Sequence, residues 1–246
     1  GGLGTFANNG TFVKSGATTT TVSGNLLFNN AGTGVVSVNA GSVLNLGGGG
    51  SSTGVYNGTG TLQITGGIYD MTSAPAATLA TNVSGATLNL NNGAVAQSIG
   101  ALGLQTSGVL NLNGSAKVTA TTLSLTGGTL GGAGTLDVTG LTTWSSGTMS
   151  GTGTTNANGG TVLNTDGTHT VTRALNLAGT TTWTNASGNG GQIQLGLGGV
   201  LTNNGTFQDQ TGFSTQITNG QGGLGTFANN GTFVKSGATT TTVSGN

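Results

Sequence analysis

Apolar and polar residues alternate in short runs along the whole chain, and each run ends at glycine or at an Asn-Gly pair. Clear examples are residues 43–46, 61–64, 87–90, 109–112, 122–125, 135–138 and 174–177. Alternation with a period of two is typical of a strand with one buried face, and glycine and asparagine favour turns. Helical spacing is not sustained anywhere, and glycine and threonine are poor helix formers. The pattern predicts an almost all-β protein.

The opening segment, from Gly1 to Asn25, returns letter for letter from Gly222 to Asn246. Self-similarity at a fixed period is typical of repeat architectures. We therefore expect residues 1–221 to form one full repeat and residues 222–246 to begin the next identical one. A finer, evenly spaced rhythm is visible in GVLNL at 108, TTLSL at 121 and GTLDV at 134. We interpret this rhythm as a strand-plus-turn unit rather than a full coil.

Similar strands separated by short turns favour a parallel β-solenoid, in which each coil covers the edge of the one before it. Leucine, valine, isoleucine and phenylalanine are expected inside, with threonine, serine and asparagine outside. A coil of about 20–26 residues would advance each repeat by roughly 45–50 Å. A sandwich or a propeller remains an alternative. Neither explains why identical copies abut at residues 221 and 222 without a proline-rich or charged hinge.

Composition narrows the function classes. The 246 residues include 52 glycines, one proline and no cysteine, and only 3% of them are charged, with a formal net charge of +0. The glycines follow no G-X-Y period, so collagen is excluded. Near-zero charge gives no attraction to nucleic acid or anionic membranes and favours self-association. No apolar run is long enough to span a membrane, and disulfides and thiolate metal sites are excluded.

Candidate chemistry is sparse. Asp166, His169 and Arg173 form the one polar-charged cluster, which could suggest a metal site or an acid–base pair. A chain with a single histidine cannot build a two-histidine metal site within one copy, and we interpret the cluster as a solvated turn and surface strand. Glycosidase chemistry needs two facing carboxylates, whereas the four aspartates lie far apart in the sequence. We expect no enzyme activity, no metal and no cofactor.

Two surface hypotheses remain. Threonine tracts at 18–21, 170–172 and 180–184 could present a flat Thr-x-Thr array, as in ice-binding solenoids, although threonine is also simply a good strand residue. Trp144 and Trp183 lie in equivalent TTW contexts and are the candidates for glycan contact. Packing in the core is the favoured alternative for both indole rings.

The phrases LTNNGTF at 201–207, GTFANNGTF at 4–12 and GTLDV at 134–138 resemble the β-strand repeats of giant bacterial surface proteins. These are the filamentous-haemagglutinin-like and autotransporter-passenger-like adhesins. The resemblance implies a right-handed parallel β-helix, secretion, and a role in adhesion, aggregation or biofilm matrix. The long identical period shifts the expectation toward an extracellular structural fibre, sheath or stalk whose partners are further copies. An adhesin shaft that binds glycans is the alternative.

Overall fold

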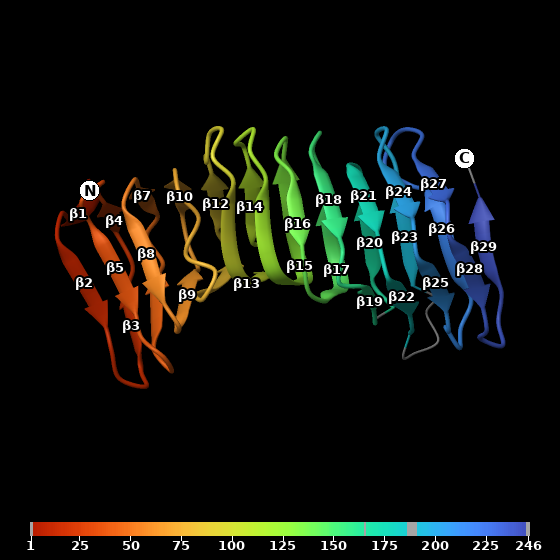
Figure 1. The fold of residues 1–246 in the computed structure, drawn as a ribbon, viewed down its shortest axis with the longest axis horizontal. Coiled ribbons are helices and arrows are strands. Elements are labelled where there is room, and N and C mark those ends of the chain that lie inside the picture. Colours follow the sequence, from red (N-terminus) through yellow and green to blue (C-terminus); the bar gives the residue numbers. More distant parts are fainter. Residues whose placement is uncertain (1, 165, 186–190, 245–246) are drawn as a thin grey trace.

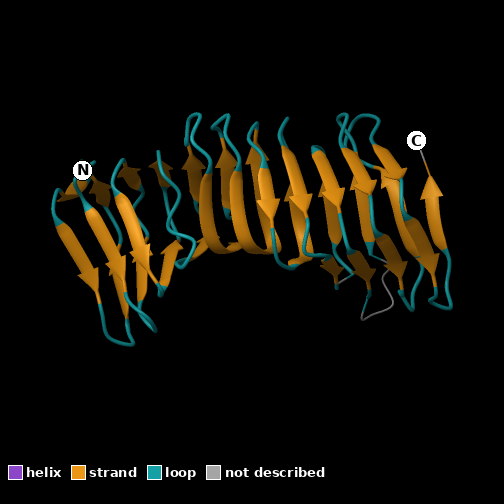
Figure 2. Cartoon of the chain, in the orientation of Figure 1, coloured by secondary structure: helices purple, strands orange, loops and turns teal. Residues whose placement is uncertain are grey.

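The protein is an elongated rod with its two termini at opposite ends (Figure 1). The computed structural model describes residues 2–164, 166–185 and 191–244. These described residues form strands and turns and contain no helix (Figure 2). Every pairing between the described strands is parallel, and the coils stack into about 10 turns. The predicted all-β parallel β-solenoid is confirmed, while its right-handed sense stays a prediction.

Each turn of the solenoid has three sides, defined by which strands pair with one another. The first side consists of β1 (Gly4–Asn8), β4 (Leu26–Asn30), β7 (Gly50–Ser52), β10 (Ile68–Met71), β12 (Thr87–Leu90), β14 (Val109–Leu112), the ends of β15 (Val118–Gly132) and β17 (Thr142–Met149), β20 (Thr168–Val171), β23 (Gln192–Leu195), β26 (Thr215–Asn219) and β29 (Thr241–Ser244).

The second and third sides are built in the same way. The second side consists of two sheets with no strand pairing between them: first β2 (Thr11–Lys14), β5 (Val35–Val38) and β8 (Val55–Gly58), and then the starts of β13 (Gln97–Gln105) and β15, β16 (Leu136–Val138), β18 (Thr154–Ala157), β21 (Ala174–Leu177), β24 (Val200–Asn203) and β27 (Thr226–Asn229). The third side consists of β3 (Thr19–Val22), β6 (Val43–Leu46), β9 (Thr61–Ile64), β11 (Ala80–Ser84), the end of β13, the middle of β15, the start of β17, β19 (Thr161–Leu163), β22 (Thr180–Trp183), β25 (Thr206–Asp209) and β28 (Thr232–Lys235).

Coil length varies along the rod. In the middle Val118 pairs with Leu136 one coil later, whereas near the C-terminal end Thr206 pairs with Thr232, across a longer stretch of chain. The middle coil is shorter than expected, because β15 bends around two corners without leaving the strand conformation (Figure 2). A corner that needs no loop shortens the coil.

The core is made of columns in which the same inward position recurs from coil to coil. One column on the third side runs through Ile64, Val83, Leu104, Leu125, Trp144, Leu163, Trp183, Asp209 and Lys235. The outward placement expected of threonine is wrong at several positions, because Thr142, Thr161 and Thr181 are buried in a neighbouring column. Their β-branched side chains suit a strand interior.

The two identical segments each form three corresponding strands, with ends that differ by at most one residue, but these strands occupy different sides of the rod. β1 lies on the first side, and its sequence copy β27 lies on the second side. β2 and β3 lie on the second and third sides, whereas their copies β28 and β29 lie on the third and first. One repeat therefore advances by whole turns plus one further side. Residues 1, 245 and 246, at the ends of the two predicted units, lie outside the described residues.

Candidate functional site: the junction between repeat copies

The junction is defined here as strands β24–β26 together with strands β27–β29. These two sets of strands pair side by side without a break in register. Inward residues stay in phase, with Leu201 beside Phe227 and Phe207 beside Phe233. Backbone hydrogen bonds continue across it, as from Thr226 N to Gly199 O and from Thr232 N to Gly205 O, each 2.9 Å. The second copy thus begins as one more coil of the first.

Aromatic rings fill the junction core. The fully buried Phe207 stacks on Phe233 with ring centroids 5.2 Å apart and an interplanar angle of 8°, and it meets Phe227 edge-on at 5.9 Å. Phe227 and Phe233 meet each other at 6.0 Å and 88°. Their copies Phe6 and Phe12 keep the same geometry at 5.8 Å and 88°. Such edge-on and offset pairs add stability beyond the buried area.

Phe28 contacts the first pair from the opposite side. Its ring stacks on Phe6 at 5.1 Å and meets Phe12 edge-on at 5.7 Å. The Phe6–Phe12 pair and its copy are therefore seen in this chain with one neighbour each, Phe28 after the first and Phe207 before the second.

An ion pair between a buried carboxylate and a partly exposed lysine continues the core column across the junction. The Asp209 side chain is fully buried, and its Oδ1 lies 3.0 Å from Nζ of Lys235. Oγ1 of Thr211 donates to the same oxygen at 2.6 Å, and the Thr241 hydroxyl donates to the other. Burial alone would raise the pKa of the Asp209 carboxyl, but these hydrogen bonds hold it below the ordinary value. The carboxylate is thus stabilised from both sides, by Thr211 of the first copy and by Thr241 and Lys235 of the second.

Lys14 is the sequence copy of Lys235, and its ammonium has other partners. Nζ of Lys14 donates to the carbonyl oxygens of Ser15 at 2.7 Å and Gly16 at 3.1 Å, and to Oγ1 of Thr18 at 3.1 Å. Its side chain is buried at the end of the rod. The same lysine thus folds back on its own turn at one end and reaches the preceding coil at the other.

An internal asparagine ladder follows the same direction at both copies. Nδ2 of the buried Asn203 donates to Oδ1 of Asn229 at 2.7 Å. Asn8, the sequence copy of Asn229, donates from Nδ2 to Oδ1 of Asn30 at 2.8 Å, and Asn30 in turn donates to Oγ of Ser52 at 3.3 Å. Asn229 and Asn8 therefore occupy equivalent positions in the ladder. Asn229 accepts a hydrogen bond from the preceding coil, and Asn8 donates one to the following coil.

Glycine at a corner lets the coils of the junction approach. A Cβ at Gly231 would collide with the backbone of Gly205, and a Cβ at Gly205 would collide with that of Gly179. At Gly10, the copy of Gly231, the same Cβ would meet none of the described residues within 4 Å. The requirement for glycine at this position therefore comes from the preceding coil.

Both sequence-predicted glycan-contact residues lie inside the rod. The Trp144 side chain is 2% exposed and meets His169 edge-on at 5.0 Å, and Trp183 is 0% exposed and meets Phe207 at 6.1 Å. Stacking on a sugar needs an open ring face, which neither indole offers. The core-packing alternative describes their observed position.

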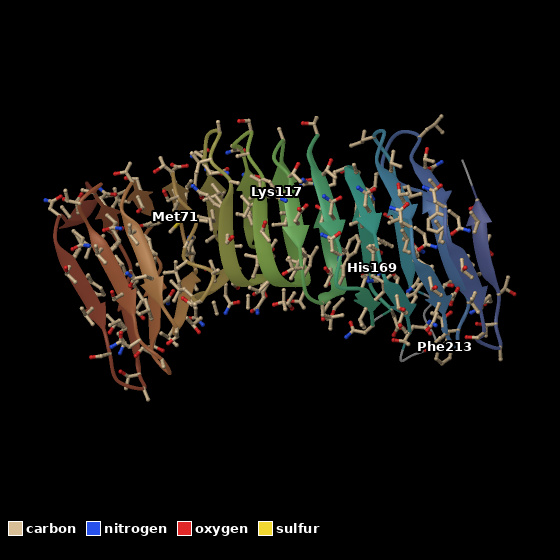
Figure 3. All side chains as sticks on the ribbon, in the orientation of Figure 1. Met71, Lys117, His169 and Phe213 are labelled. Carbon is tan, nitrogen blue, oxygen red and sulfur yellow. The ribbon has the colours of Figure 1, made fainter. Side chains whose placement is uncertain are left out.

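The predicted polar cluster is not a surface turn throughout. His169 and Arg173 are buried, and Asp166 is half-buried (Figure 3 marks His169). The two ring nitrogens of His169 lie 3.2 Å from Gln192 O and 2.9 Å from Trp144 O. Burial lowers the pKa of His169, outweighing these carbonyl contacts. The solvated interpretation is thus wrong for the histidine and the arginine.

The buried guanidinium of Arg173 ties successive coils together. It donates to Gly134 O at 2.8 Å, Ser150 O at 3.2 Å and Gly131 O at 3.4 Å. Burial lowers the pKa of Arg173 to about 10. These partners are backbone carbonyls, and this arrangement suits a structural role.

Other candidate chemistry is dispersed. Oδ2 of Asp137 lies 2.9 Å from Nζ of Lys117. On the next coil the residue paired with Asp137 is Asn156, not Asp166. Burial would raise the pKa of the Asp137 carboxyl, but hydrogen bonds from Asn156 and Lys117, together with the charge of Lys117, hold it below the ordinary value. The described residues contain no group of three metal-ligating side chains. Nor do they include a helix long and apolar enough to cross a membrane.

The threonine tracts do not form a uniform array. Thr182 faces outward between Val162 and Gln208 on the neighbouring coils, so its column is mixed. A separate groove of about 250 Å³ lies on the third side and is lined by Gln63, Thr65, Asn82, Ser84 and Gln105. Its lining consists entirely of amide and hydroxyl side chains.

The fold and the junction define the class of this protein as a parallel β-solenoid whose tandem copies join in register. No protein-family model, no curated protein and no solved structure matches the chain. The similarity to β-helix repeat proteins therefore rests on the architecture itself.

Sequence reasoning missed the charged pair of the junction. In TFQD at 206–209 and TFVK at 232–235 the charged residue lies two positions after phenylalanine. Side chains two apart on a strand share a face, so the buried phenylalanine already placed Asp209 and Lys235 inward. A charge in phase with an apolar residue was the available signal.

Proposed function

We propose that the chain is a structural repeat module of an extracellular bacterial fibre, sheath or stalk. Its partners are further copies of the same repeat, stacked along one axis, and it carries out no catalysis and needs no cofactor. The observation that supports this most directly is the junction, where strands of the second copy pair with strands of the first at every side. Copies joined in this way form one rod rather than separate beads.

Stiffness follows from the direction of the hydrogen bonds. In a parallel solenoid the backbone hydrogen bonds between coils lie along the long axis, so bending the rod must distort many of them together. The low charge of the chain also limits repulsion between neighbouring rods. Both properties suit a stalk or a matrix filament.

The test is the length of a two-copy chain, in which residues 1–221 are followed directly by residues 1–246. Electron microscopy should show a single rod longer than the present chain by about 50 Å, the axial advance of one repeat. A matched control carries a flexible Gly-Ser linker between the copies and should show a bend or gap there. If the directly joined two-copy chain appeared as two separate beads, the proposal would be overturned.

An adhesin shaft that binds glycans is the second candidate, and the polar groove on the third side favours it. Amides and hydroxyls are the groups that pair with sugar hydroxyls. Binding of the present chain to a glycan array should be lost in Gln63→Ala/Gln105→Ala. It should persist in Gln210→Ala, whose side chain bonds Gln208 away from the groove. Unchanged binding in the groove variant would exclude the groove as the contact.

A further inference from the structure

The end of the rod formed by β1–β3 has the same sequence as a coil that already sits on another coil. Its copy, β27–β29, is seated on β24–β26 in this structure. An unpaired strand edge is a ready template for further pairing. The preferred neighbour of β1–β3 can therefore be deduced from the residues that contact β27–β29.

We infer that the end surface formed by β1–β3 is a docking site for strands β24–β26 of a second copy of this repeat, with Lys14 pairing with Asp209 of that copy. This inference rests on the proposed function in taking copies to be coaxial. It adds the identity of the contacting strands and the residues that make the contact specific.

Three contacts carry the inference. Phe12 would stack on Phe207 of the other copy, as Phe233 does at 5.2 Å. Oδ1 of Asn8 would accept a hydrogen bond from Nδ2 of Asn203, as Oδ1 of Asn229 does at 2.7 Å. Gly10 would sit on Gly205, where its lack of a Cβ is required, as at Gly231.

Lys14 would change partners on docking. In β1–β3, where no preceding coil is present, the Lys14 ammonium donates to Ser15 O, Gly16 O and Thr18 Oγ1. In the occupied copy the ammonium instead donates to Asp209 Oδ1 at 3.0 Å, to Thr211 O at 3.2 Å and to Thr211 Oγ1 at 2.9 Å. A buried carboxylate without its cation is costly. The ion pair thus favours this neighbour over a solenoid edge that lacks an inward aspartate.

Gly231→Ala in the full chain provides the test, because it should displace residues 222–244 and open β24–β26. Another molecule can then dock its β1–β3 there, which gives open head-to-tail association. Sedimentation should show a concentration-dependent weight-average mass of at least about twice the monomer. Limited proteolysis should first show that residues 222–244 have become cleavable.

The matched variants change no charge. Gly10→Ala/Gly231→Ala should remain monomeric, because the added Cβ at Gly10 blocks docking while meeting none of the described residues within 4 Å in the chain itself. Gly212→Ala/Gly231→Ala should associate like Gly231→Ala. A Cβ at Gly212 meets none of the described residues even with the second copy seated. A separate charge variant, Lys14→Met in the Gly231→Ala background, should weaken association by about tenfold.

Several outcomes would overturn the inference. They are the absence of association once residues 222–244 are cleavable, equal association of the Gly10→Ala double variant, or continued protection of residues 222–244. Lys235→Glu opens the same edge by repulsion from Asp209 and replaces Gly231→Ala if that variant fails to fold. The rod length of the unsubstituted two-copy chain is independent of these results, so the proposed function can fail or stand separately.

Discussion

The first and last segments of the chain share one sequence and differ only in which coil lies beside them. In the first segment Lys14 bonds its own turn and Gly10 faces open space, whereas in the last Lys235 bonds Asp209 and Gly231 lies against Gly205. Corresponding strands and the edge-on phenylalanine pair nevertheless form in both segments. Local sequence therefore sets the strands and ring packing, and the neighbouring coil sets the side-chain partners. Each substitution below has a matched partner, either at the equivalent position of the other segment or in the coil that contacts it.

Removing the ring beside each phenylalanine pair should have the largest effect. Phe207→Ala and Phe28→Ala each delete a fully buried ring and should each lower the free energy of unfolding by about 3–5 kcal/mol. Phe207→Ala should loosen the last coil and Phe28→Ala the first. Chemical unfolding measures the loss, and hydrogen exchange identifies the affected coil. If both variants loosened the same coil, the two rings would not be equivalent neighbours.

The corner glycines should give opposite results. Gly231→Ala forces a Cβ against the Gly205 backbone and should cost about 1–3 kcal/mol. Gly10→Ala places the same methyl group in open space and should be neutral or slightly stabilising. Thermal unfolding followed by circular dichroism compares the two variants directly. Equal destabilisation would show that glycine is needed for its own backbone and not for the coil beneath.

The lysine pair should show a smaller difference of the same kind. Lys235→Met leaves the buried Asp209 carboxylate with hydroxyl and backbone N–H donors only. It should cost about 2 kcal/mol, discounted because Lys235 is partly exposed. Lys14→Met removes contacts to a turn of its own segment and should cost less than about 1 kcal/mol. Urea unfolding of both variants makes the comparison, and a larger loss at Lys14 would contradict it.

Acid should weaken the last segment and spare the first. The pKa of Asp209 is lowered in the folded protein, so its contribution to stability is full above the ordinary carboxyl pKa of about 4 and is lost as the pH falls through the folded value. The first segment pairs with β4–β6, and no carboxylate lies in these strands or in the first segment itself. Hydrogen-exchange protection factors, corrected for the intrinsic rate, should fall below pH 4 at residues 226–244 more than at residues 4–22. Equal losses would argue against the ion pair.

Much of the fold could be predicted from alternation alone. The runs at 43–46 and 109–112 are strands β6 and β14 with the predicted face buried. Coil length could not be predicted, because it depends on whether a corner needs a loop. The finer sequence rhythm gave no guide either, since each coil passes three sides and the amount of chain it uses varies along the rod.

The candidate site was harder to predict for a different reason. Alternation indicates that two residues share a face but does not say what lies across the core from them. Trp144 and Trp183 therefore could not be separated from surface rings until the coils were stacked. Asp209 and Lys235 become partners only because the second copy returns in phase with the first.

The extra side gained per repeat has a consequence for a long fibre. In the proposed fibre each copy would start one side further around the rod than the copy before it, because β1 lies on the first side and its copy β27 on the second. A label on one residue of every copy would trace a slow spiral and return to the same line at each third copy. At the usual spacing of stacked strands that interval is on the order of 150 Å.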